Sequence, residues 1–164
     1  VSSFARKQLS KSWRDLENKR VFSMDSEQVR RLRVRRKGEP EFGFVRAIEQ
    51  DPQGKSGPVW KLESDTELSA DRAKISGMLS SLEALKAQKT QAASKPSECG
   101  LAKGEGTEIT VSLVSGDELT LQISDQRDDD THFARASGGP MTSIFTLSST
   151  QAEKLSRAQK DLMN

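Results

Sequence analysis

Apolar and polar residues alternate along several segments of the chain, and turn residues separate these segments. In residues 29–36, Leu32 and Val34 fall on one side and arginines fall on the other, so this period of two predicts a half-buried strand. The clearest alternation lies in residues 109–113 and 119–123, which flank a Ser-Gly-Asp-Glu turn and therefore predict a β-hairpin. Shorter strands are predicted at residues 42–48, 59–63, 132–136 and 142–147.

Three other segments place their apolar residues at helical spacing. A basic amphipathic helix is predicted for residues 3–18. A longer helix is predicted to begin near Ser69, a plausible N-cap residue, and to end by Gln91. A closing helix follows Thr150 and Glu153, which have the spacing of a capping box. The three apolar faces consist of Ala5, Leu9, Trp13 and Leu16; of Ile75, Met78, Leu79, Leu82 and Leu85; and of Leu155, Ala158 and Leu162.

A group of strands followed by a helix occurs twice along the chain. The first copy covers residues 21–91 and the second covers residues 107–164, with the helical lead-in 1–20 before them and a Gly-rich linker, 92–106, between them. This order predicts an α+β fold of two tandem modules, each with an antiparallel sheet covered by a helix.

The composition limits both the core and the chemistry. Only 33% of the residues are hydrophobic and 30% are charged, so the core must be modest. The single cysteine, Cys99, and the single histidine, His132, exclude an internal disulfide and a usual zinc site. No segment approaches the roughly 18 consecutive apolar residues of a membrane span. Because the first residue is Val1 and not Met, we expect the chain to be a piece of a longer protein.

The net charge of +2 is spread unevenly along the sequence. Residues 1–50 contain 13 Lys and Arg against 7 Asp and Glu, whereas residues 101–164 contain 6 against 10. A basic front and an acidic rear could orient the molecule against a membrane or a partner. Uneven charge of this kind also occurs without any function.

The strongest local feature is a run of arginines in the first predicted strand. Arg31, Arg33 and Arg35 share one face there, about 7 Å apart by strand rise, and could together bind the phosphates of a nucleic acid or of lipid headgroups. The alternative is a solvated face on which these arginines pair with carboxylates of the next strand, namely Glu39, Glu41 and Glu49. Nucleic acid is disfavoured, because neither stacking aromatics nor a groove-reading helix accompanies the run.

No other residues suggest catalysis or metal binding. Asp128, Asp129 and Asp130 could ligate calcium, but they lack the spacing, central Gly and closing Glu of an EF-hand, which favours a solvated loop. His132 has no partner at a recognised catalytic spacing, and no histidine motif surrounds Cys99. We therefore expect no catalytic residue, no metal ligand and no cofactor, and predict that the protein is not an enzyme.

Several short stretches together resemble a known family. They are Arg14-Asp15 through Lys19-Arg20-Val21-Phe22-Ser23-Met24-Asp25, then Val29–Val34, Trp60-Lys61-Leu62 and Ala70-Asp71 with the following helix, then Leu101 through Val111, Leu119–Ile123 and His132-Phe133-Ala134-Arg135. With these stretches the chain resembles the bacterial family called domain of unknown function 4340, in which Tyr is usual at the position of Phe133.

The resemblance implies a place in the cell and not an activity. Such proteins resemble accessory, extracytoplasmic parts of bacterial envelope systems, held at the inner membrane by an N-terminal helix, with genes often beside gliding-type transporters. A membrane anchor is then expected upstream of Val1. We predict a non-catalytic interaction or scaffold domain with a protein partner in the envelope, such as a membrane transporter complex. Recognition would use an edge strand or the arginine face. The alternative is a basic-face binder of nucleic acid or anionic lipid through Arg31, Arg33 and Arg35.

Overall fold

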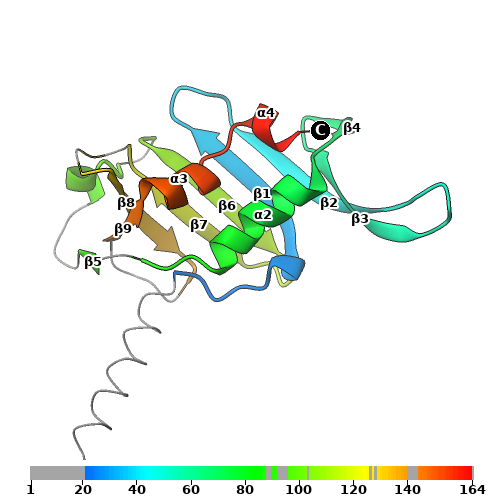
Figure 1. Ribbon diagram of the computed structural model, residues 1–164, viewed down its shortest axis with the longest axis horizontal. Coiled ribbons are helices and arrows are strands. Elements are labelled where there is room, and N and C mark those ends of the chain that lie inside the picture. The colour runs from blue at the N-terminus through cyan, green and yellow to red at the C-terminus, as the bar shows by residue number, and fades with distance from the viewer. Residues whose placement is uncertain are drawn as a thin grey trace, which may run out of the picture.

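The computed structural model describes residues 21–87, 90–91, 96–102, 104–125, 127, 129–139 and 144–163. The strands in this part of the chain form a single antiparallel sheet with the order β4-β3-β2-β1-β6-β7-β8-β9-β5 (Figure 1). The strands are β1 (Val29–Arg36), β2 (Phe42–Gln50), β3 (Ser56–Leu62), β4 (Asp65–Ser69), β5 (Thr90–Gln91), β6 (Thr107–Leu113), β7 (Glu118–Ile123), β8 (Thr131–Ser137) and β9 (Ile144–Ser148).

The antiparallel pair β1–β6 joins the two halves of the chain. Leu32 lies opposite Val111 and Arg33 lies opposite Thr110 in this pair. On either side of it the strands follow in chain order, β2, β3 and β4 on one side and β7, β8 and β9 on the other, so the strand order is mirrored about the pair. The prediction of an α+β fold is confirmed, and the two halves of the chain share one antiparallel sheet. Two separate sheets would leave the backbone groups of β1 and β6 unpaired along two edges, whereas their direct pairing satisfies both.

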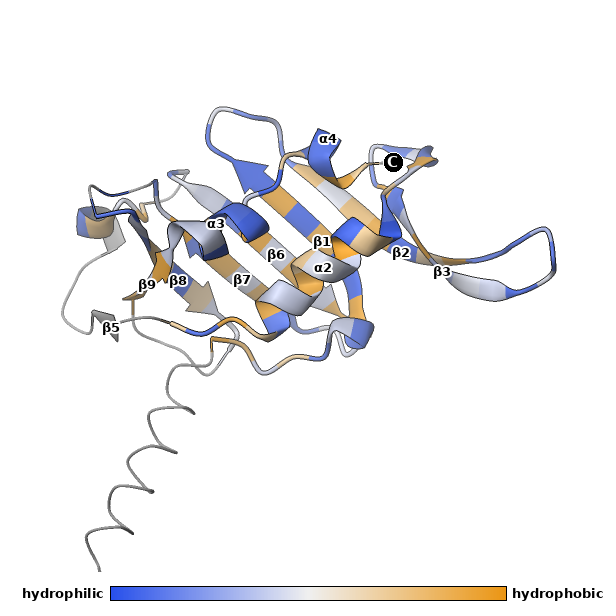
Figure 2. Ribbon diagram, in the orientation of Figure 1, coloured by the Kyte–Doolittle hydropathy of each residue, from blue (hydrophilic) through white to orange (hydrophobic). Residues whose placement is uncertain are grey.

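The α-helices cover one face of this sheet (Figure 1). They are α2 (Arg72–Glu83), α3 (Ser149–Leu155) and the short α4 (Gln159–Leu162), and two 3₁₀ turns, η1 (Ser26–Gln28) and η2 (Pro96–Cys99), complete the described helices. Hydrophobic and hydrophilic residues form alternating bands along the strands beneath the helices (Figure 2). The sheet therefore directs one side chain in two toward the helix layer.

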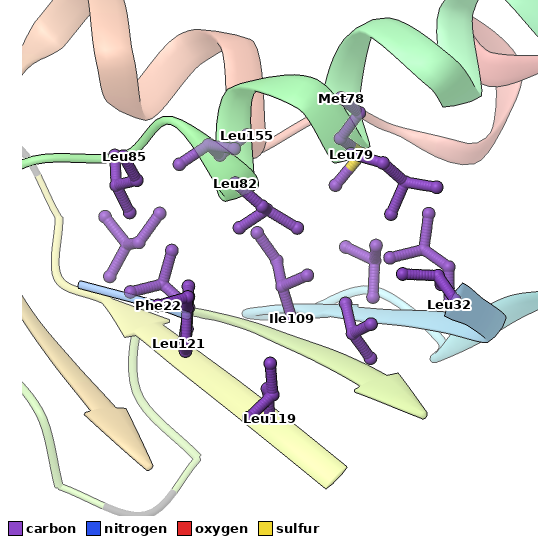
Figure 3. Close-up of a cluster of buried hydrophobic side chains, with 14 of the residues drawn as sticks. Phe22, Leu32, Met78, Leu79, Leu82, Leu85, Ile109, Leu119, Leu121 and Leu155 are labelled. Atoms are coloured by element: carbon purple, nitrogen blue, oxygen red, sulfur yellow. The ribbon is translucent and has the colours of Figure 1, made fainter. Parts of the chain in front are cut away.

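A single main core lies between the helices and the sheet. Met78, Leu79 and Leu82 of α2 point toward the strands, and Leu155 of α3 joins them (Figure 3). Leu32 and Ile109, which come from different halves of the chain, contribute to the same cluster. The core is therefore shared between the halves, and the sequence-derived stripe from Ile75 to Leu85 is buried throughout.

The ends of the helices differ from those predicted. Asp71, not Ser69, caps α2, because its carboxylate accepts hydrogen bonds from the backbone N–H groups of Ala73 and Lys74. The helix ends at Glu83, well before Gln91. Ser69 belongs instead to β4, a strand that the sequence pattern did not predict.

The closing helix is also shorter than predicted. Its capping box consists of Ser148 and Gln151, and not of Thr150 and Glu153, because β9 ends at Ser148 in an extended conformation that suits an N-cap. The helix stops at Leu155, and α4 begins separately at Gln159.

The remaining strand predictions hold with small changes. β3 begins at Ser56, three residues before the predicted start, so β2 and β3 form a long hairpin that extends past the helix layer (Figure 1). The predicted helix over residues 3–18 lies outside the described residues, as do positions 142 and 143 of the predicted last strand. Among the described residues, no helix combines the length and apolar character that crossing a membrane requires.

Candidate functional site

The arginine row lies on the sheet face away from the helices. Leu32 and Val34 of β1 are fully buried in the core, so Arg31, Arg33 and Arg35 project from the opposite face. Each of the three guanidinium groups forms an ion pair there. Arg31 and Arg33 share the carboxylate of Glu63, at 3.5 Å for Arg33, and Arg35 lies 2.9 Å from Glu108.

A glycine on the neighbouring strand makes room for the shared carboxylate. Gly43 of β2 lies opposite Arg33 in the register. A Cβ atom at this position would overlap with Oε2 of Glu63. The absence of a side chain at residue 43 therefore leaves room for Glu63, just after β3, to reach across β2 to the arginines of β1.

The predicted carboxylate partners are only partly those in the structure. Glu41 lies 3.9 Å from Arg33, but Glu39 pairs with Arg36 at 3.2 Å and Glu49 pairs with Lys61 at 2.8 Å. Sequence reasoning missed Glu63 and Glu108, the closer partners. The register of β1 with β6 places Arg35 directly opposite Glu108, and no local sequence signal contains that pairing.

These ion pairs predict weak binding of polyanions. A carboxylate already occupies the geometry that a phosphate would need, so we expect Glu63→Gln to raise the affinity for heparin by about threefold to tenfold at low salt. Fluorescence anisotropy of labelled heparin over a series of salt concentrations measures the change. The control is Glu67→Gln, which makes the same charge change on β4, away from the arginine row. Strong wild-type binding that is lost when Arg31, Arg33 and Arg35 become alanine would contradict this expectation.

A groove lies on the other side of the sheet, between the β2–β3 hairpin and α2. Its volume is about 570 Å³. The hairpin extends past the helix layer at this point, so its inner face continues where α2 no longer covers it (Figure 1). The lining consists of Ser26 and Glu27 of η1; Arg46 and Ile48 of β2; Ser56, Gly57, Pro58 and Trp60 of β3; and Arg72, Ser76, Leu79 and Ser80 of α2.

Part of the groove lining is apolar. Trp60 and Leu79 are buried, but Ile48 is 77% exposed, the highest exposure among the large hydrophobic residues of the described chain. Ile48 lies opposite Pro58 in the hairpin register. Single exposed apolar residues are common, but one beside a tryptophan and a leucine in a groove is typical of a binding surface.

Two arginines flank these apolar residues. Arg46 donates a hydrogen bond to the backbone carbonyl of Glu27, and Arg72 begins α2. In the described residues neither guanidinium forms an ion pair, whereas Arg31, Arg33, Arg35 and Arg36 of β1 all do. The groove therefore combines apolar surface with cationic groups that have no carboxylate partner among the described residues.

The outer edge of β3 is poorly suited to strand addition. The carbonyl of Trp60 accepts a hydrogen bond from the N–H of Ala70, so Trp60 directs its backbone groups away from β2. Pro58, two residues earlier, faces the same way and offers no N–H. A partner strand would find a missing donor there, which is a common protection of sheet edges.

The other candidate residues show structural contacts. Asp129 accepts hydrogen bonds from the hydroxyl and N–H groups of Thr131, and this hydroxyl contact, more than the nearby Arg127, lowers the pKa of Asp129. Asp128 lies outside the described residues. In the described ranges no three potential metal ligands gather at one place. Nδ1 of His132 contacts the carbonyl oxygen of Ser124 at 2.8 Å, and Cys99 is buried in a small apolar cluster with Leu101 and Ile144.

Comparison with known protein families gives one assignment. The sequence pattern of a family described as a domain of unknown function, DUF4340, matches residues 60–164. The chain belongs to the DUF4340 family. The match begins at Trp60 in β3 and includes α2 and all of the second half, so one wall of the groove lies inside the DUF4340 match and the other wall outside it. No curated protein sequence matches the chain, and no solved structure matches it.

Proposed function

We propose that this DUF4340 protein is a non-catalytic interaction module that holds a partner protein in the groove between the β2–β3 hairpin and α2. The observation that supports it most directly is the exposure of Ile48 beside buried Trp60 and Leu79. Leaving an isoleucine in water costs about 1.5–3 kcal/mol relative to burying it, so a partner that covers this side chain gains that energy.

The same geometry gives less support to the alternative, a basic-face binder. Arg31, Arg33 and Arg35 each have a carboxylate within 4 Å. A nucleic acid or an anionic lipid would have to displace Glu63 and Glu108 before it reached the guanidinium groups. The groove requires no such displacement.

The proposal includes a duplicated module. Strands β1–β4 with α2, and strands β6–β9 with α3, follow the same order along the chain, and their positions in the sheet are mirrored about the β1–β6 pair. This supports two copies that share one sheet. The lining residues of the groove all belong to the first copy.

We also propose an extracytoplasmic location in the bacterial envelope, with the module anchored at the inner membrane as an accessory of a transporter-type complex. The support is the family resemblance described above. Fractionation of cells that express the full-length protein, together with protease protection in spheroplasts, tests this location. A protein recovered in the cytosol and inaccessible to protease would contradict it.

Site-specific photo-crosslinking in cells tests the groove itself. A photoreactive residue at position 48 should give discrete adducts with another protein, because this side chain would lie in the interface. The matched control is position 114, since Val114 is also an exposed hydrophobic residue, at 54%, and lies outside the groove. Equal adducts at both positions, or none at position 48, would contradict the proposal.

A further inference from the structure

The charges around the groove indicate what kind of segment fits it. Its ionisable lining residues are Arg46, Arg72 and Glu27. The adjoining surface around β3 adds the carboxylates of Glu49, Asp51 and Asp71 and the ammonium group of Lys55. The charge that a binding segment encounters in the groove therefore depends on which of these groups already have partners.

The adjoining carboxylates are already engaged. Glu49 forms an ion pair with Lys61 at 2.8 Å. Asp51 accepts hydrogen bonds from the N–H groups of Gln53 and Lys55, and Asp71 accepts two at the start of α2. Neither arginine of the groove forms an ion pair within the described chain, and the one hydrogen bond of Arg46 goes to the neutral backbone carbonyl of Glu27. Glu27 also forms no ion pair within the described chain, so the groove has two unpaired arginines against one unpaired carboxylate, and the balance of its charge is positive.

The arginines also lie on opposite walls. Arg46 projects from β2 and Arg72 from the first turn of α2, and Ile48, Trp60 and Leu79 lie among the same lining residues. A segment bound between the walls would place apolar side chains against Ile48, Trp60 and Leu79 and acidic side chains near the two arginines. Guanidinium groups form bidentate, charge-assisted hydrogen bonds with carboxylates, which adds orientation as well as affinity.

We infer that the groove binds an acidic, apolar segment of a partner protein, with an aliphatic or aromatic anchor against Ile48 and Trp60 and a carboxylate paired with Arg72 or Arg46. This inference rests on the proposed function, because it names the chemistry of the partner at the same groove. It is the helix-in-groove or peptide-in-groove mode of recognition, in which apolar anchors supply affinity and charges select the partner.

Selection from a displayed library of random peptides tests the inference with the whole chain as bait. Enriched peptides should combine large apolar residues with Asp or Glu. Fluorescence anisotropy with synthetic versions should show that Arg72→Glu weakens binding by about tenfold or more and shifts the preference toward peptides with Lys or Arg. Arg30→Glu is the matched control, because Arg30 is an exposed arginine on β1 outside the groove, and this change should leave the affinity unaltered.

A second variant separates this inference from the proposed function. If enriched peptides bind wild type, lose binding in Ile48→Asp and show no preference for acidic residues, the groove is a binding site and the inference about its partner is wrong. If enriched peptides bind Ile48→Asp as tightly as they bind wild type, or if no peptide is enriched, the proposed function and the inference about the partner are both wrong. A dimer of the chain that dissociates in Ile48→Asp, seen by sedimentation, would place a second copy in the groove and also overturn the inference.

Discussion

Replacing Leu82 with alanine is expected to lower the free energy of unfolding by about 2–5 kcal/mol. Leu82 is 1% exposed on the sheet-facing side of α2 and lies in the core cluster with Leu32 and Ile109 (Figure 3). The loss combines the transfer of the removed methyl groups with the cavity left in a closely packed core. Urea denaturation followed by far-UV circular dichroism measures it. Leu68→Ala, at a residue that is 46% exposed, is the control and should change stability by less than about 0.5 kcal/mol.

The loss of stability caused by Leu82→Ala should affect both halves of the chain. Because β1 pairs with β6 and one core runs beneath α2 and α3, we expect the whole sheet to unfold as one cooperative unit. Native-state hydrogen exchange should show that the slowest amides of β1 and of β7 lose the same protection in Leu82→Ala. If only the amides before residue 91 lost protection, the halves would unfold independently and the single cooperative unit would be wrong.

Replacing Gly106 with alanine is expected to lower the free energy of unfolding by about 2–4 kcal/mol, through backbone strain and a steric clash. Gly106 has φ of 66°, in the left-handed region, and a Cβ atom there would overlap with the carbonyl oxygen of Ile123. That carbonyl belongs to β7 where it pairs with the start of β6, since Thr107 lies opposite Ile123. The substitution would therefore push the two strands apart, and thermal unfolding measures the effect.

Gly104 provides the matched control for this prediction. It also has a positive φ, 88°, but apart from its neighbours along the chain no atom of the described residues lies within 4 Å of the place where a Cβ would be. Gly104→Ala should therefore cost only the conformational strain, roughly 1–2 kcal/mol. Equal losses for the two variants would show that the contact with Ile123 is not a constraint.

Local sequence patterns predicted the strands whose two faces differ most. β1 has the predicted bounds, and the hairpin of β6 and β7 lies where the alternation of Ile109 to Leu113 with Leu119 to Ile123 placed it. Period two is a property of the strand itself, so it can be read without knowledge of neighbours. The apolar stripe of α2 was equally clear because five residues repeated at helical spacing, four of them within α2 and Leu85 just after its end.

Boundaries were harder to predict because neighbours decide them. Ser69 and Asp71 are both acceptable N-caps by type, but Ser69 pairs with Lys61 in the sheet, so the helix can begin only after it. Ser148 caps α3 for a similar reason, since β9 extends to that residue. Local propensity does not distinguish between these candidate N-cap residues, and the tertiary structure determines which of them caps the helix.

The candidate site shows the same division. The arginine row was visible in the sequence, yet its partners Glu63 and Glu108 became evident only from the register of three strands and the space above Gly43. The groove was not predicted. Ile48 has the same parity in β2 as the buried Phe42 and Phe44, but the hairpin carries Ile48 beyond the helix layer that covers the other two.

The sequence by itself determined the α+β class, the principal strands, the faces of β1 and the DUF4340 resemblance. These follow from side-chain periodicity and short motifs, which are local properties of a chain. Only the tertiary structure decided that the two halves share one sheet, that the arginines of β1 are paired and that Ile48 remains in solvent. Each of these features depends on the order of the strands in the sheet and on how far the helices extend over it. Contacts between residues that are distant in sequence determine the strand order and the extent of the helix layer.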